Sequence, residues 1–84
     1  MVRFRDTEEI ANAVASLSSV ALDDLIDRIE DIVRDPQHRN CWGLVGYRSR
    51  WIRFRGYHVA FLIDERPVDV ERWSAIVIRM KPRG

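Results

Sequence analysis

The sequence predicts a single α+β domain of the order β-α-α-β-β-β, in which a helix hairpin packs on one face of a small, mostly antiparallel sheet. Apolar residues recur at helical spacing in the first half of the chain and alternate with charged residues in the second half. The 84 residues can bury one modest core. We therefore treat residues 1–84 as one domain.

The first two predicted elements are a short strand and a helix. Residues 2–4 alternate apolar and charged side chains, as a half-buried strand does. Asp6 is predicted to cap a helix over residues 7–17, because two glutamates follow it and acidic groups suit a helix N-terminus. The apolar stripe of this helix consists of Ile10, Val14 and Leu17.

A second helix is predicted to begin after Ser19, a suitable N-cap, and to end at Pro36. Its apolar residues form a continuous stripe and its acidic residues occupy the other faces. Because few residues separate the two helices, an antiparallel helix hairpin is expected. The stripe consists of Leu22, Leu25, Ile26, Ile29, Ile32 and Val33.

The second half is predicted to form the rest of the sheet. Gly43 and Gly46 bracket a turn or loop that leads into a hairpin over residues 51–63, with its tight turn at Gly56. A last strand is expected over residues 72–80. Because side chains alternate along a strand, Ile52 and Phe54 should point inward. Trp51, Arg53 and Arg55 should then point to the other face.

The sequence argues against a membrane protein and against a secreted one. No stretch of the chain has the length of apolar sequence that a membrane span needs, and the N-terminus does not resemble a signal peptide. Cys41 is the only cysteine, so no internal disulfide can form. A cytoplasmic protein without membrane association is expected.

The charge is divided between the two halves. Residues 1–40 hold five Arg and nine Asp or Glu, a net charge of −4, whereas residues 41–84 hold eight Arg, one Lys and four Asp or Glu, a net charge of +5. This asymmetry favours an anionic partner for the second half. The alternative is that the acidic helices and the basic sheet complement each other within the domain.

The sequence gives little indication of a metal site or a cofactor-binding site. His38, Cys41 and His58 lack the paired spacing of metal ligands, so neither a metal site nor a cofactor is expected. The glycines lack the Lys-Ser/Thr that completes a phosphate-binding loop. No pattern marks a Ser-His-Asp or Cys-His catalytic triad, and Cys41 is interpreted as a small, inert side chain.

The more informative pattern is cationic. Arginines near Trp51 and basic residues on the last strand suit the binding of phosphates and stacked bases, if the two strands are neighbours. The alternative is an ordinary solvated sheet face on which arginine stems cover apolar surface. The residues concerned are Arg48, Arg50, Arg53, Arg55, Arg79, Lys81 and Arg83.

Three segments resemble the RelE/ParE superfamily of bacterial toxins. Residues 42–46 (Trp-Gly-Leu-Val-Gly) stand where these toxins have a Leu-x-Gly entry to the sheet. Residues 51–64 resemble the family's basic strand, its turn, and the apolar run that ends in Asp. Residues 76–83 resemble its last apolar strand and the basic residue after it. The resemblance covers nearly the whole chain and implies the same order of elements.

The resemblance implies a toxin of a type II toxin–antitoxin system, held inactive by a cognate antitoxin. RelE-like members cleave mRNA on the ribosome. The resemblance therefore implies a set of RNA-binding residues, for which the candidates are Arg48, Arg50, Arg55, Arg79 and Lys81. By position, Arg53 and Arg83 match the family's basic residues, and His58 stands where many members have Arg. These three are the candidate catalytic residues, since arginine stabilises phosphate charge and an imidazole can transfer protons. The alternative for His58 is a half-exposed strand residue without a chemical role.

Departures from the family pattern keep other activities open. Many nuclease members have a Tyr or His-Tyr beyond the last strand, whereas here only Gly84 follows Arg83. Some members also keep a Glu in the middle strand, which is absent here. A nuclease would then depend on His58 and the cations. The alternatives are a ParE-like toxin that binds DNA gyrase without nuclease activity, and a catalytically degenerate binding module of the same fold.

Overall fold

The computed structural model describes residues 1–35, 42–44 and 47–83. The α+β class is confirmed, and the described strands number one more than the sequence predicted, because a strand lies at residues 42–44. The elements in chain order are β1 (Val2–Phe4), α1 (Glu8–Ser16), α2 (Ser19–Arg34), β2 (Trp42–Leu44), β3 (Tyr47–Phe54), β4 (Tyr57–Asp64), the 3-10 helix η1 (Val70–Arg72) and β5 (Ser74–Pro82).

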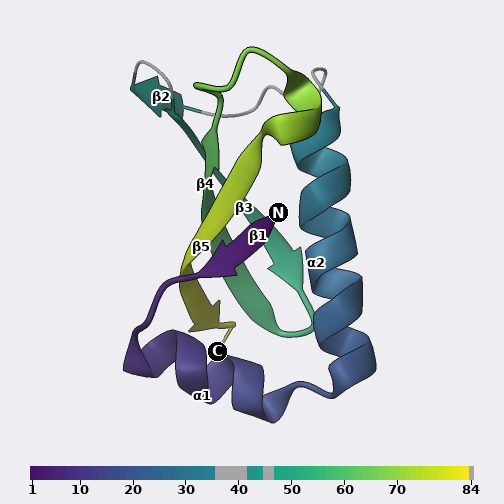
Figure 1. The fold of residues 1–84 in the computed structure, drawn as a ribbon. Coiled ribbons are helices and arrows are strands. Elements are labelled where there is room, and N and C mark those ends of the chain that lie inside the picture. The colour runs from purple at the N-terminus through teal and green to yellow at the C-terminus, as the bar shows by residue number, and fades with distance from the viewer. Residues whose placement is uncertain (36–41, 45–46, 84) are drawn as a thin grey trace.

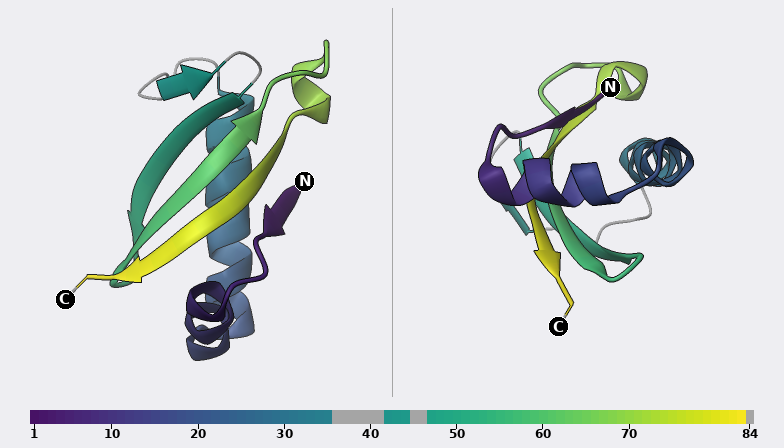
Figure 2. Two further views of the ribbon diagram at one scale, coloured as in Figure 1. Left: turned by 90° about the vertical axis from the view of Figure 1, so that its left-hand side faces the viewer. Right: turned by 90° about the horizontal axis from the view of Figure 1, so that it is seen from below.

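The strands form one mixed sheet in the order β1-β5-β4-β3-β2. The β1–β5 pair is parallel, and the other three pairs are antiparallel. Helix α2 runs along one face of the sheet, whereas no helix of the described residues packs along the opposite face (Figures 1 and 2). We call this opposite face the outer face; it is turned toward the viewer in the left panel of Figure 2.

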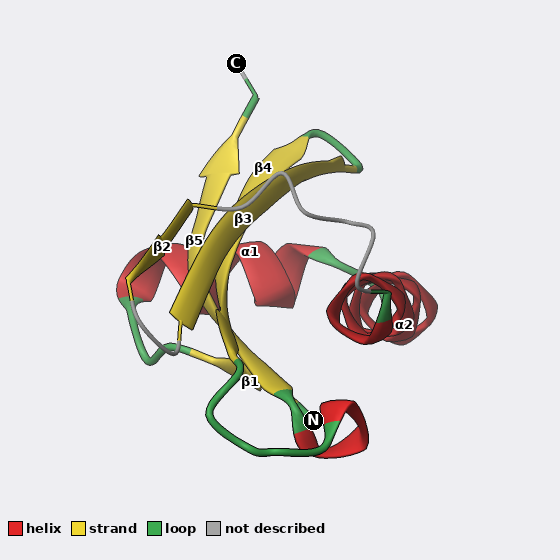
Figure 3. Cartoon of the chain, turned by 90° about the horizontal axis from the view of Figure 1, so that it is seen from above, coloured by secondary structure: helices red, strands yellow, loops and turns green. Residues whose placement is uncertain are grey.

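The predicted antiparallel helix hairpin is wrong. Helix α1 lies across one end of the sheet and contacts mainly β5, whereas α2 contacts β5, β1 and η1 (Figures 1 and 3). The link between the helices is only Leu17 and Ser18, and both have extended backbone angles that redirect the chain. Because Ile10 and Ala13 are buried in the same core as the strands, α1 has no need of α2 as a partner.

Both predicted helix caps are wrong by one residue. The N-cap of α1 is Thr7 rather than Asp6, because the Thr7 hydroxyl accepts a hydrogen bond from the Ile10 amide at 3.2 Å. The N-cap of α2 is Ser18 rather than Ser19, since its hydroxyl accepts from the Ala21 amide at 3.1 Å. In both helices the capping oxygen satisfies an amide three residues on, one of the first four amides that lack an intrahelical partner. Pro36, the predicted helix stop, lies outside the described residues.

The core lies between α2, α1 and the inner face of the sheet. Alternate residues of β4 are buried and the residues between them are only half-buried, so one face of this central strand supplies the core. Ile52 and Phe54 on β3 point inward, as predicted. The largest side chains that are almost fully buried are Phe61, Leu25, Ile29, Met80, Val59 and Val77.

The predicted hairpin is confirmed and is longer than expected. Strand β3 begins at Tyr47, four residues before the predicted start at Trp51. The turn or loop predicted at residues 43–46 is wrong in its first half, because β2 pairs with β3 from Trp42 to Leu44. Arg55 and Gly56 form the turn with φ angles of 45° and 82°. Positive φ at both central positions matches the turn that best fits the twist of two paired strands.

The last strand begins two residues later than predicted and ends at Pro82. Its register against β4 shifts between Ala60 and Phe61, because Ala60 pairs with Arg79 whereas Phe61 pairs with Val77. Ile78 is therefore the extra residue of a β-bulge. In the described part of the chain, no helix is long and apolar enough to cross a membrane.

Candidate functional site

Three basic side chains lie side by side across the outer face. Arg53 on β3 is directly opposite His58 on β4, and His58 is directly opposite Lys81 on β5. Neighbouring strands are about 4.8 Å apart, so the three side chains share one short strip of surface. We call Arg53, His58 and Lys81 the cation row, after the guanidinium and the ammonium group on either side of the imidazole.

The β-bulge brings Lys81 into this row. Val77 and Met80 are both buried, although they are three residues apart and regular alternation would place them on opposite faces. The extra residue at Ile78 resolves this conflict, because it shifts the alternation by one. Arg79 and Lys81 are consequently exposed.

An aromatic side chain lies next to the cation row. The indole of Trp51 stacks on the imidazole of His58, with 5.1 Å between ring centroids and 29° between ring planes. Trp51 remains 52% exposed, so much of the ring is open to solvent. Its cross-strand neighbour is the small residue Ala60, which leaves the indole uncovered on that side.

Arg83 follows β5 at the same end of the sheet. Its amide donates a hydrogen bond of 2.7 Å to the Gly56 carbonyl, which holds the chain beside the β3–β4 turn. The three candidate catalytic residues, Arg53, His58 and Arg83, are therefore brought to one end of the sheet. The candidate RNA-binding residue Lys81 joins them.

Arg79 lies on the outer face but is paired within the chain. Its Nε and Nη2 atoms donate to the two carboxylate oxygens of Glu9, each at 3.0 Å, and the Met80 amide donates to Glu9 at 3.1 Å. These contacts, led by the Arg79 hydrogen bonds, lower the pKa of Glu9 and raise that of Arg79. Glu9 thereby connects α1 to the part of β5 that follows the residues paired with β1.

Arg55 is also paired within the chain. Its Nη2 donates to the Asp24 carboxylate of α2 at 3.2 Å, and its guanidinium carbon lies 5.6 Å from the centroid of the Phe54 ring. The turn therefore points Arg55 toward α2, away from the cation row. The exposed pair contributes little to stability, because water screens it.

Arg48 and Arg50 lie on the inner side of the sheet. They pair with Ile63 and Phe61, two core residues of β4, so alternation directs them to the face that α2 covers. Arg48 forms an ion pair with Glu65. The Nη1 atom of Arg50 is buried and has no hydrogen-bond partner among the described residues. The structure thus separates these two arginines from the cation row.

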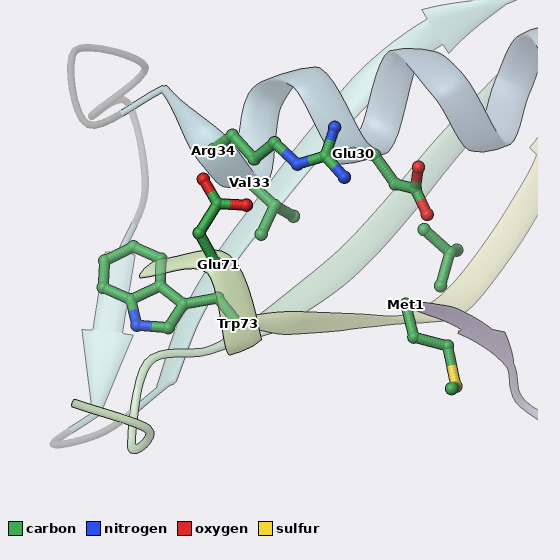
Figure 4. A pocket seen from close by; sticks show the side chains of 7 residues that line it. Met1, Glu30, Val33, Arg34, Glu71 and Trp73 are labelled. Carbon is green, nitrogen blue, oxygen red and sulfur yellow. The ribbon is translucent and has the colours of Figure 1, made fainter. Parts of the chain in front are cut away.

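Sequence patterns did not reveal two shallow sites beside the sheet. One, with a cavity volume of about 20 Å³, is shown in Figure 4 and has room for about one water. The other lies on the outer face and has a volume of about 190 Å³. The first is lined by Met1, Val2, Glu30, Val33, Arg34, Glu71 and Trp73, and the second by Arg3, Leu62, Asp64, Arg66, Ser74, Ala75 and Ile76.

Within the part of the chain that the structure describes, no three His, Cys, Asp or Glu residues gather in a way that could hold a metal ion. His38 and Cys41, considered as ligands above, lie outside the described residues. For the described residues, the site is thus a set of cations, one imidazole and one indole on an open sheet face.

Comparisons with models of known protein families, with curated proteins and with solved structures found no match.

Proposed function

We propose that the protein is a RelE/ParE-like toxin that cleaves mRNA on the ribosome, with the outer face as its RNA-binding surface. The observation that carries the proposal is the cation row, with Arg53, His58 and Lys81 in cross-strand register beside the exposed Trp51. Cations and an aromatic ring on one open face suit the phosphates and bases of a single strand.

The row supplies groups for phosphodiester cleavage. His58 accepts the proton of a ribose 2′-hydroxyl, whose oxygen then bonds to the adjacent phosphorus. Arg53 and Lys81 flank the imidazole and stabilise the negative charge that develops on the phosphate oxygens. The bond to the leaving 5′-oxygen breaks, and that oxygen takes a proton from a water molecule. The proton that His58 accepted then passes to the hydroxide left behind, which restores both the imidazole and the water. Arg83, beside the turn, adds positive charge at the same end.

The charge of the outer face also supports the proposed partner. Exposed cations attract anionic surfaces of several kinds, so an acidic antitoxin would compete with RNA for the same residues. We propose a cognate antitoxin that covers the cation row, as the resemblance to this superfamily implies. Addition of such a protein would then prevent RNA binding and cleavage together.

A second candidate is a ParE-like toxin that binds DNA gyrase. The observation that favours it is the pairing of three arginines within the chain, Arg48 with Glu65, Arg55 with Asp24, and Arg79 with Glu9. This pairing leaves fewer cations for RNA than the sequence suggests. The exposed Trp51 would then contact a protein partner, since tryptophan is enriched where interfaces bind most strongly.

The test is an in vitro translation reaction with purified ribosomes, a defined mRNA and the purified protein, with cleavage mapped by primer extension. The wild-type protein should cut the message, and His58→Gln should reduce the rate by roughly a hundredfold or more, the usual contribution of a positioned acid or base. Arg53→Ala should weaken cleavage, whereas Arg5→Ala, an exposed arginine before α1, should not.

Circular dichroism melts of each variant show whether the fold is retained. Normal cutting by folded His58→Gln and Arg53→Ala proteins would contradict the assignment of the site. An intact message, together with loss of DNA supercoiling by purified gyrase, would replace the nuclease with the second candidate.

A further inference from the structure

The outer face has a second feature at the end opposite Arg83. A hollow of about 190 Å³ lies over β1, β5 and β4. Arg3 pairs with Ile76 and Ile76 pairs with Leu62, so these three residues form a second cross-strand row. Asp64 and Ser74 form the next pair, at the end of the hollow. Helix α2 covers only the reverse side of these strands (Figure 2).

The floor and the rim of the hollow differ in chemistry. Leu62 and Ile76 supply an apolar floor, and both are only half-buried. Around it stand the guanidinium groups of Arg3 and Arg66, the hydroxyl of Ser74 and the carboxylate of Asp64. A flat ligand with apolar faces and a hydrogen-bonding edge matches this combination, and a nucleobase is such a ligand.

The carboxylate of Asp64 determines which hydrogen-bonding groups the edge of a bound base must present. Its carboxylate accepts three hydrogen bonds from Arg66, from the amide at 3.1 Å, Nε at 2.9 Å and Nη2 at 2.8 Å. These contacts lower the pKa of Asp64 to about 2, so the group is ionised and only accepts hydrogen bonds at neutral pH. A carboxylate has about four lone-pair sites, so roughly one remains for a ligand donor.

The hollow and the cation row lie on one strand. Leu62 follows His58 by four residues on the same face of β4, which corresponds to about 13 Å along the strand. Trp51 lies between them, beside Ala60. A single-stranded RNA held by its phosphate at the row can therefore run along β4 and place a neighbouring base over Leu62.

We propose that this hollow binds a nucleobase whose exocyclic amino group donates to Asp64, from the same RNA strand that the cation row holds by its phosphate. The inference rests on the proposed function, because it takes single-stranded RNA as the ligand. Adenine and cytosine present an amino group where uracil presents a carbonyl oxygen. In the same orientation, uracil places its carbonyl oxygen against the carboxylate of Asp64. Both groups are hydrogen-bond acceptors, so the hollow discriminates against uracil.

The experiment measures equilibrium binding of cytidine and uridine oligomers of equal length by fluorescence anisotropy at one salt concentration. The wild-type protein should bind the cytidine oligomer roughly tenfold more tightly, the discrimination that one good side-chain–base contact provides. Asp64→Asn replaces an acceptor with a donor and should remove the preference. The matched control is Glu65→Gln, because Glu65 pairs with Arg48 rather than lining the hollow, and it should keep the preference.

A second measurement does not depend on any variant. The methyl resonances of Leu62 and Ile76 in the wild-type protein should shift on addition of the cytidine oligomer. Equal affinity for both oligomers with unshifted methyl resonances would overturn the proposed hollow. If Arg53→Ala still weakens the binding of both oligomers in that case, the proposed function stands without a nucleobase site in the hollow. Failure of the wild-type protein to bind either oligomer would overturn both proposals.

Discussion

The imidazole of His58 stacks on the indole of Trp51, with 5.1 Å between the ring centroids. This contact joins residues that are diagonal neighbours, since Trp51 pairs with Ala60 and His58 pairs with Arg53. It fixes the direction in which the imidazole points on an open face. Trp51 is therefore a positioning residue for His58, in addition to offering its exposed surface to a base.

Replacement of Trp51 tests whether its ring orients the imidazole of His58. Trp51→Ala should lower the cleavage rate by tenfold or more, because a misplaced acid or base loses much of its contribution. Trp51→Phe should restore most of the rate, since a phenyl ring can still stack on the imidazole. Single-turnover cleavage on ribosomes measures both. Equal rates for the Ala variant and the wild type would show that the stack does not orient His58.

The salt dependence of RNA binding counts the cations that contact phosphate. For a single strand, each contact contributes a slope of about −0.7 to log K against log salt concentration. Arg53→Ala and Lys81→Ala should each reduce the magnitude of the slope by about 0.7. Arg48→Ala should leave it unchanged, because Arg48 lies on the inner side and pairs with Glu65.

Titrations of a fluorescent oligomer at four or more salt concentrations give these slopes. An Arg48→Ala slope that falls as much as that of Arg53→Ala would mean that RNA reaches the inner side of the sheet, contrary to the assignment of the outer face.

Much of the sheet was predictable because its signals are local. The alternation of Ile52 and Phe54 with Arg53 assigned the faces of β3 correctly, and Gly56 marked the turn. The helix stripes likewise placed Leu25 and Ile29 in the core. These features depend on the period of a single element, which the order of residues records directly.

The rest of the site depends on contacts between distant segments. Arg79 and Glu9 are 70 residues apart, so no local pattern indicates their ion pair. The bulge at Ile78 was also missed, because an extra residue is recognisable only against the partner strand. Arg48 and Arg50 were grouped with the other cations since the predicted strand began too late to assign their face.

The Glu9 ion pair makes stability depend on pH. The contacts with Arg79 and the Met80 amide lower the pKa of Glu9 in the folded state below its ordinary value of 4.5. The folded state therefore binds fewer protons in the acid range, and stability rises with pH there. The contribution is fully present above the unfolded pKa and is lost as pH falls through the lowered, folded value.

Glu9→Gln should consequently lower the melting temperature near neutral pH and have no effect in strong acid. Glu8→Gln is the matched control, because Glu8 lies in the same first turn and is exposed. Melting curves recorded from neutral pH to about pH 2 provide the comparison, and Asp64 titrates alike in all three proteins. A difference between wild type and Glu9→Gln that stays constant with pH would contradict the role of this carboxylate.

Deletion of one residue tests the bulge that exposes Lys81. Without Ile78, the strand would read Val77, Arg79, Met80 and Lys81, in which buried and exposed positions alternate regularly. The deletion should keep a cooperative melting transition and RNA binding by the cation row.

The control is deletion of Met80, which removes a fully buried side chain. It should destabilise the fold by at least the roughly 2–5 kcal/mol of a core Met→Ala change. Urea denaturation of both proteins gives the two free energies. If the protein lacking Ile78 were the less stable of the two, the extra residue would belong to the core packing of α1 and β5 rather than to the register of the strand.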